Sequence, residues 1–262
     1  TVDPSTLCPY CDNPLPSSPS PTLRTLLETM AKKSYPDPRP TNVLGRKAPF
    51  STFISVCQRH RFESDILPEA KSKGWPSAID WKKLAGRIEK LKPKLQLLID
   101  DDSDDGPRAR SSAWNEIMEL VKEKGSRAAT GVKDQFLNFE KTQPGYYGEL
   151  GSIIIHQTLY DLFPPTSIDV ESIAPLGAEE FLQRVLFPEV ALRLVMEDQR
   201  LKGNSGRREA LKILRDSSVY GVAMFPAEQS AEGKYGSGKL GGPSSTRGSG
   251  MHGNTKGRLE RW

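Results

Sequence analysis

The stretch LCPYCDNPLP, Leu7–Pro16, places two cysteines in a Cys-x-x-Cys pair directly before a run of prolines. Such a pair is either a redox dithiol or one half of a metal site. A redox dithiol needs its first thiolate at the N-terminus of a helix that runs out of the motif. The prolines that follow Cys11 do not allow a helix to continue from the motif. The pattern therefore favours the metal site.

The third cysteine supplies the second half of that site. Cys57 and His60 form a Cys-x-x-His pair, and the two pairs together offer three thiolates and one imidazole, a full tetrahedral set for zinc. Four protein ligands leave no open position for water, so we expect the metal to stabilise the fold rather than to catalyse. A reactive thiol and unrelated buried cysteines are the alternatives. The predicted ligands are Cys8, Cys11, Cys57 and His60.

Composition limits the class of protein. The 262 residues can bury an ample core, although only 36% are hydrophobic and some of the chain is expected to be unfolded. No apolar run approaches the ~18 residues that a membrane-spanning helix needs, so we expect no membrane contact. Three cysteines in a metal pattern fit a reducing compartment. Thr1 in place of Met leads us to expect a fragment or a processed chain.

Apolar spacing predicts a mainly α fold with a few short strands, in which a zinc-stapled N-terminal knuckle packs on a helical body. Proline 93 should kink or split the helix that contains it, and Pro188 should interrupt another. The expected helices are 22–33, 79–99, 113–124, 153–163, 179–186, 189–201 and 207–216. The expected strands are 50–56 and 219–225.

The chain divides by composition into a folded domain, 1–226, and a tail, 227–262. Within the domain we expect a proline-rich connector at 34–49 and a mobile acidic loop at 100–112. The tail is rich in Gly, Ser, Lys and Arg, so it should be disordered. Its six basic and three acidic residues supply +3 of the net charge of +4. The nearly neutral domain is a poor match for a dedicated duplex-binding surface.

Two further groups of residues are candidate sites, each with a plainer interpretation. Four cations that repeat at helical spacing could contact phosphates, or could form a solvated helix face that the following aspartates neutralise. A turn with two glycines and two tyrosines could admit a ligand, or could be a structural turn that packs its tyrosines on the core. The cations are Lys83, Arg87, Lys90 and Lys94, and the turn is Gly145, Tyr146, Tyr147 and Gly148.

Other titratable residues give weaker signals. His156 has apolar neighbours and is expected to be a hydrogen-bonded helix histidine. Glu197 and Asp198 are adjacent in the sequence, so on a helix they point in two directions and are expected on a solvated face. Because neither a catalytic triad nor a facing carboxylate pair emerges, we expect no enzyme activity.

Five segments together resemble the C-terminal domain of the fungal restriction of telomere capping protein 4 family. In chain order they are LCPYCDNPLP, VCQRHRFESDILPEAKSKGWP, GYYGELG, VLFPEVALRLVMED and SSVYG. The resemblance covers about residues 7–226, without the acidic loop and the tail. It implies a nuclear and cytoplasmic fungal protein that influences telomere capping, with no established enzyme activity.

Two functions are therefore in play. The first is a non-enzymatic, zinc-stabilised interaction module with an unidentified protein partner. The alternative is nucleic-acid binding, weak in the domain itself, through the basic helix face 83–94 and the basic tail.

Overall fold

The computed structural model describes residues 2–101, 103, 105–125 and 144–227. They form a mainly helical protein with one two-stranded sheet, which confirms the predicted fold class. The predicted tail, apart from Ala227, lies outside the described residues, as do two aspartates of the predicted acidic loop. None of the described helices is both long and apolar enough to cross a lipid bilayer.

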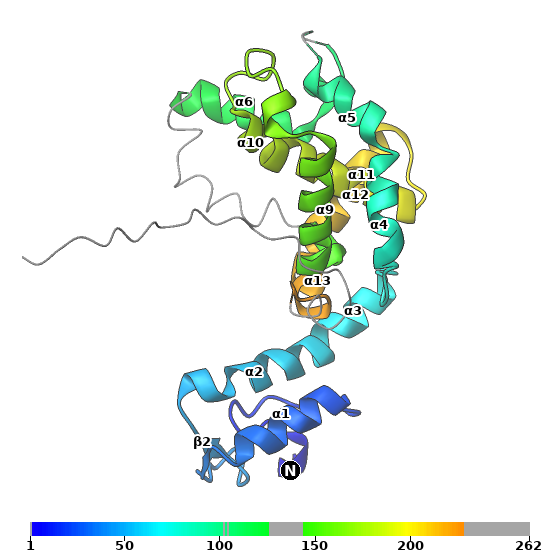
Figure 1. The fold of residues 1–262 in the computed structure, drawn as a ribbon. Coiled ribbons are helices and arrows are strands. Elements are labelled where there is room, and N and C mark those ends of the chain that lie inside the picture. The colour runs from blue at the N-terminus through cyan, green and yellow to red at the C-terminus, as the bar shows by residue number, and fades with distance from the viewer. Residues whose placement is uncertain (1, 102, 104, 126–143, 228–262) are drawn as a thin grey trace, which may run out of the picture.

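Two regions with separate apolar cores make up the described chain. The N-terminal lobe contains α1 (Pro21–Ala31), the hairpin of β1 (Tyr35–Pro36) and β2 (Arg46–Lys47), and α2 (Phe50–Arg61). Its core is small and consists of Cys8, Leu23, Val56 and Cys57. Helix α2 continues through the π-helical residues Phe62–Ile66 into α3 (Leu67–Ser72), which joins the helical body (Figure 1).

The helical body has a much larger core, to which nearly every one of its helices contributes. Figure 1 shows α9 running through the middle of this body, with α4 beside it and α13 near the lobe. The helices are α4 (Trp81–Glu89), α5 (Lys92–Ile99), α6 (Ser112–Lys124), α9 (Gly148–Leu162), α10 (Ala178–Phe181), α11 (Phe187–Asp198), α12 (Gly203–Asp216) and α13 (Ser218–Met224).

Local sequence explains where several helices begin. Helix α1 starts at Pro21 after Ser20, whose hydroxyl accepts a hydrogen bond from the Leu23 backbone N–H at 3.1 Å. This arrangement combines an N-cap serine with a proline at the first helical position. Helix α6 is capped in the same way by Ser111. The helix predicted over 79–99 is split as expected, and the break falls at Lys90–Leu91, just before Pro93.

Proline 188 does not interrupt its helix, contrary to the prediction. A five-residue π turn, Leu182–Leu186, precedes α11, and the Phe187 backbone N–H donates to the Leu182 carbonyl. The wider turn shifts the hydrogen-bond register, so the missing N–H and the ring of the proline are accommodated. The same device, Phe62–Ile66, precedes Pro68 and keeps α2 and α3 continuous.

Both predicted strands are helices, so that part of the prediction is wrong. Residues 50–56 form the first half of α2, and 219–225 lie mostly in α13. Their β-branched and aromatic side chains favour strands only as a weak preference, which tertiary packing overrides. Val56 packs in the lobe core, and Tyr220 packs between Phe62 and Trp75 in the body.

Candidate functional site

The four predicted ligands form one cluster in the lobe. The Sγ atoms of the three cysteines and one ring nitrogen of His60 all lie within 4.8 Å of one another. Cys57 and His60 are three residues apart on α2, so both point to the same side of the helix. Cys8 and Cys11 lie in a turn where the Asp12 N–H donates to the Cys8 carbonyl at 3.0 Å. The site therefore combines one turn with one helix, rather than two turns.

Distances within the cluster fit a tetrahedral ion. The Nε2 atom of His60 lies 3.2 Å from Cys11 Sγ, so Nε2 is the nitrogen that faces the sulfurs. Neighbouring S and N ligands of a zinc ion are about 3.6 Å apart when Zn–S is about 2.3 Å and Zn–N about 2.0 Å. The other nitrogen, Nδ1, is buried without a hydrogen-bond partner among the described residues. The residues present fit a bound metal.

Electrostatics also favour a cation at this position. Burial raises the pKa of the Cys8 and Cys57 thiols, because a thiolate loses hydration there. Burial lowers the pKa of His60, which keeps the imidazole neutral, as a metal ligand must be. A divalent ion would offset the cost of the buried thiolates. The chemistry that such an ion supplies in a closed four-ligand site is the cross-linking of the turn to α2.

The hairpin is held against this cysteine turn by polar contacts. Arg39 donates to Asp12 Oδ1 at 2.6 Å and to the Pro9 carbonyl at 2.7 Å. The Asn42 amide donates to the Cys8 carbonyl at 3.2 Å, and the Arg46 backbone N–H donates to the Pro9 carbonyl at 2.7 Å. The Arg39 and Thr41 hydrogen bonds lower the pKa of Asp12 to about 2. The predicted connector is thus an ordered part of the lobe.

A second group of residues gathers in the body, around the Gly-Tyr-Tyr-Gly turn. Gly145 and Gly148 have φ angles of 58° and 61°, which L-residues rarely adopt. The backbone of Gly148 lies against the carbonyl of Gly221 in α13, and a side chain at either glycine would collide with the other segment. Both tyrosines between the glycines are fully buried. The structure shows a packed turn at this position.

Asp198, at the end of α11, connects this turn to α4. Its Oδ2 accepts from the hydroxyls of Tyr146 and Tyr147 at 2.8 Å and 2.5 Å, and its Oδ1 accepts from Arg87 at 2.7 Å. Burial raises the pKa of both tyrosines, so both remain protonated donors at neutral pH. Arg87 also donates to Glu197, at 3.2 Å. Asp198 stays partly exposed, as expected for a solvated face, but its carboxylate also binds three side chains.

The Gly-Trp-Pro segment at 74–76 meets the same region. The Tyr220 hydroxyl donates to the Pro76 carbonyl at 2.9 Å, and the Trp75 and Tyr220 rings are 5.5 Å apart. Four of the five segments that carried the family resemblance therefore contact one another in the body. The remaining one holds Cys8 and Cys11 in the lobe.

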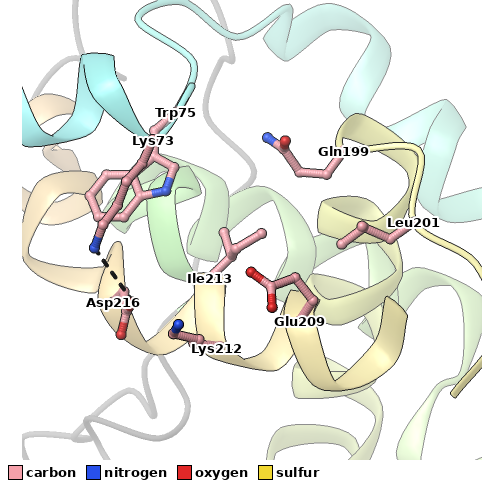
Figure 2. Close-up of a pocket in the computed structure, with 8 residues that line it drawn as sticks. All are labelled: Lys73, Trp75, Gln199, Leu201, Glu209, Lys212, Ile213 and Asp216. Carbon is pink, nitrogen blue, oxygen red and sulfur yellow. Dashed lines mark ion pairs between the residues drawn. The ribbon is translucent and has the colours of Figure 1, made fainter. Parts of the chain in front are cut away.

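A groove runs beside this region, between residues 73–80 and the helices α11 and α12. One hollow of about 450 Å³ and another of about 290 Å³ share Gln199 in their walls. Figure 2 shows the larger hollow, with Trp75 and Gln199 on either side and an ion pair between Lys73 and Asp216 of 3.5 Å. Glu209 and Lys212, both exposed, line it from α12. The groove combines charges of both signs with apolar side chains, among them Leu201 and Ile213.

The four cations of the predicted basic row have different environments. Lys83 pairs with Asp80 at 2.8 Å, and Arg87 is bound to the Asp198 group. Lys90 and Lys94 are exposed. Asp101 of the predicted acidic loop binds Ser103 and the Arg108 backbone N–H, and among the described residues it contacts no cation of the row. Nucleic-acid contact by the row remains a prediction. Among the described residues, Lys90 and Lys94 are the two cations of the row without an ion-pair partner.

Among the described residues, His156 has no polar partner of the kind expected from the sequence. Its ring stacks on Phe187 at 4.3 Å, and burial lowers its pKa. Sequence reasoning missed Arg108, which is buried, donates to the carbonyls of Leu98 and Ile99, and lies over the Trp114 ring at 5.0 Å. No sequence pattern marks it, because its partners are backbone carbonyls from other segments.

Comparison with protein families places part of the chain in a known family. Residues 107–226 match the family model described as the RTC4-like domain. This match confirms the resemblance over the C-terminal half of the body, where the Gly-Tyr-Tyr-Gly turn and Asp198 lie. No curated protein and no solved structure gives a significant match to the chain.

Proposed function

We propose that this protein, whose residues 107–226 match the RTC4-like domain, is a non-enzymatic, zinc-stabilised interaction module in a nuclear process. The RTC4-like domain indicates a role related to telomere capping. The family resemblance supports a location in both nucleus and cytoplasm. The protein would act by binding another protein.

One observation carries the structural role of the metal: four ligand atoms from Cys8, Cys11, Cys57 and His60 come together within 4.8 Å. Three thiolates with one imidazole are typical of structural zinc, which takes four protein ligands and keeps no water. This donor set supports zinc as the cofactor. A metal held in this way stabilises the lobe and has no position for a substrate.

The way the body uses its reactive groups supports the non-enzymatic part of the proposal. The Asp198 carboxylate accepts from two buried tyrosines and from Arg87, so its oxygens are occupied by fixed donors. His156 is packed against Phe187. Glu189 is buried and accepts from Arg207 at 2.9 Å and 2.8 Å. These groups hold helices together.

The groove beside α12 is the surface that we assign to the protein partner. It lies against the segments that carried the resemblance, and its charged residues Glu209 and Lys212 have no ion-pair partner among the described residues. Free charges of both signs give specificity to a protein contact through complementary pairing.

Affinity capture from fungal nuclear extract tests this assignment. Three baits are used, each with and without nuclease: the full chain, Lys212→Glu and Arg208→Glu. Arg208→Glu is the control, because Arg208 is exposed on α12 but does not line the groove. We expect a protein that is retained after nuclease treatment and by the control, and is lost from Lys212→Glu. Capture that disappears with nuclease, or that is equal for both variants, would contradict the proposal.

Nucleic-acid binding through the basic helix face is the second candidate function. Lys90 and Lys94 are the exposed cations that support it. Two phosphate contacts on B-DNA give a salt slope of only about −2. Titration of duplex DNA against the parent chain and the double variant Lys90→Glu/Lys94→Glu measures the affinity that these two lysines contribute. A large loss of affinity in the double variant would favour this function over the first.

A further inference from the structure

The lobe exposes two aromatic rings at the end farthest from the body. Tyr35 in β1 is 76% exposed and Phe50 at the start of α2 is 67% exposed. Aromatic rings are usually buried, because covering one removes a large apolar area from water. Figure 1 shows β2 beside the start of α2, away from α3 and the helical body. The rings therefore lie on a free surface of the protein.

Exposed lysines accompany these rings in the same segment of the lobe. Lys47 is the direct cross-strand partner of Tyr35, so both side chains stand on the same face of the hairpin. Lys47 also precedes Phe50 by three residues, and Lys32 and Lys33 lie between α1 and Tyr35. All three lysines are exposed, and none makes an ion pair with a residue that the structure describes. We call Lys32, Lys33, Tyr35, Lys47 and Phe50 the aromatic–lysine patch.

The charge of this segment is one-sided. Residues 32–50 contain five basic side chains and one acidic side chain, Asp37. That carboxylate lies 3.5 Å from Arg39, which also binds Asp12. The other arginine, Arg46, donates to the carbonyls of Ala31 and Ser34 at 2.8 Å and 2.7 Å and faces the lobe. The three exposed lysines thus give residues 32–50 an excess of positive charge, and Lys47 places part of it beside the Tyr35 ring.

The patch is fixed to the cysteine turn. The Tyr10 ring, between Cys8 and Cys11 in the sequence, stacks on Phe53 at 5.3 Å, and Phe53 contacts Phe50 edge-on at 5.7 Å. The Tyr10 hydroxyl lies 3.2 Å from Ser34 Oγ, next to Tyr35. Arg39 and Arg46 bind the hairpin to Pro9. The fold that closes the metal cluster therefore also fixes the Phe50 ring against Phe53 and the backbone of the strand that carries Tyr35 before any ligand arrives, which lowers the entropy cost of binding.

From these observations we propose that the aromatic–lysine patch binds a single-stranded nucleic acid, with bases stacked on Tyr35 and Phe50 and phosphates on the lysines. Exposed aromatic rings beside cations are the means by which proteins hold single strands without reading sequence. A duplex keeps its base faces stacked inside and offers the rings nothing to stack on. An acidic polypeptide would use the lysines but would not need planar rings.

This inference goes beyond the proposed function, which places a protein partner on the groove beside α12. It also places nucleic acid on the lobe rather than on the helix row at 83–94. The body can bind its partner whether or not the lobe binds a strand.

Fluorescence anisotropy with a labelled oligothymidine of about 15 nucleotides, at several salt concentrations, tests the proposal on the full chain. Loss of one stacking ring weakens single-strand binding by about fivefold or more. We therefore expect at least this loss for Tyr35→Ala and for Phe50→Ala, and near-parent affinity for Tyr35→Phe, which keeps a ring. Lys47→Glu should weaken binding and reduce the salt slope by at least about 0.7.

Matched controls lie on the body. Leu97→Ala removes an apolar side chain that is 56% exposed on α5, and Arg208→Glu reverses an exposed cation on α12. Both should bind as the parent does, and melting curves should agree for all variants because every changed side chain is exposed. The tail is present in every variant, so its basic residues contribute equally.

Three results would overturn the proposal. One is unchanged affinity for the two aromatic variants. The second is equal or tighter binding to a duplex of the same length. The third is competition by polyglutamate at the same charge concentration as oligothymidine, with the same dependence on Tyr35, which would make the patch a docking surface for acidic protein.

Discussion

The N-terminal lobe and the helical body reach a stable fold by different means. The lobe core has four buried residues, two of which, Cys8 and Cys57, are predicted metal ligands. The body buries side chains from nearly all of its helices in a single core. Small units bury too little apolar surface to offset their chain entropy, and a metal commonly supplies the difference. The comparison predicts that the lobe depends on a metal bound by this cluster and that the body does not.

The largest expected effect comes from breaking the metal cluster. Cys57→Ser removes one of four ligands, and structural zinc contributes on the order of 10 kcal/mol to folding. We expect the lobe to unfold while the body remains folded, because their cores are separate. Limited proteolysis and a thermal melt, together with elemental analysis for one zinc per chain, measure this.

The matched control for this change is Gln58→Ser, on the exposed side of the same helix. It should keep the zinc and the melting profile. A parent chain that is fully folded but contains no metal would refute the role of the cluster, and simultaneous unfolding of both regions would refute their independence.

The next effect tests close packing in the body. Gly221→Ala places a methyl group against the Gly145 carbonyl and the Gly148 backbone, which cannot move without breaking the turn. We expect a loss of about 3 kcal/mol in the free energy of unfolding. Gly86→Ala is the control, since it is also in a helix but has open space around it. Alanine there should stabilise the protein by about 1 kcal/mol. Chemical denaturation of both variants gives the two values, and equal effects would contradict the packing argument.

A smaller effect is expected at Asp198. Asp198→Ala leaves the buried hydroxyls of Tyr146 and Tyr147 without their acceptor, which should cost about 2 kcal/mol. Glu197→Ala is the control, because Glu197 is adjacent, 59% exposed, and contacts only Arg87 among the described residues. It should cost less than about 0.5 kcal/mol. Urea denaturation distinguishes them. Similar losses for both would mean that the carboxylate does not serve as the tyrosine acceptor.

The smallest effect concerns Glu63, which lies where the two regions join. Burial by itself raises the pKa of this carboxyl, but hydrogen bonds from Ser20 and from Arg59 at 2.6 Å leave the pKa below its usual value. A carboxyl with a lowered folded pKa stabilises the protein above its unfolded pKa, about 4.3, and this contribution disappears as the pH falls through the folded pKa. The interaction is expected to contribute about 1.5 kcal/mol at neutral pH.

Glu63→Gln should therefore lower the stability at pH 7 and reduce the difference from the parent as the pH falls below about 4. Glu28→Gln, at an exposed site on α1, should show no such pH-dependent difference. Thermal melts between pH 3 and pH 7 measure both. A constant difference between Glu63→Gln and the parent over this range would contradict the linkage.

Several features of the protein could be predicted from the sequence. The apolar spacing predicted a mainly helical fold, and Pro93 correctly indicated a split near Lys90 and Leu91. Two pairs of metal-ligand residues with two-residue spacers indicated the cluster, because such spacing lets both side chains of a pair reach one ion. These are local properties, fixed by the order of residues along a short stretch.

Long-range packing decided the rest. The segments at 50–56 and 219–225 have strand-like composition, yet they form helices because their apolar side chains fit the two cores. The presence of Pro188 in the sequence does not predict whether the helix ends there or continues through a π turn, as it does in the structure. Asp198 was expected in solvent, and only the approach of Tyr146, Tyr147 and Arg87 from distant segments made it an acceptor for three side chains.

The sequence alone determined the chemical identity of the candidate metal centre and the helical character of the chain, because both depend on residue types at short spacing. The tertiary structure decided which polar groups are buried, which glycines are in contact, and that Tyr35 and Phe50 remain exposed beside three free lysines. The physical reason is that burial and charge pairing depend on segments far apart in the chain, whose approach no local pattern encodes.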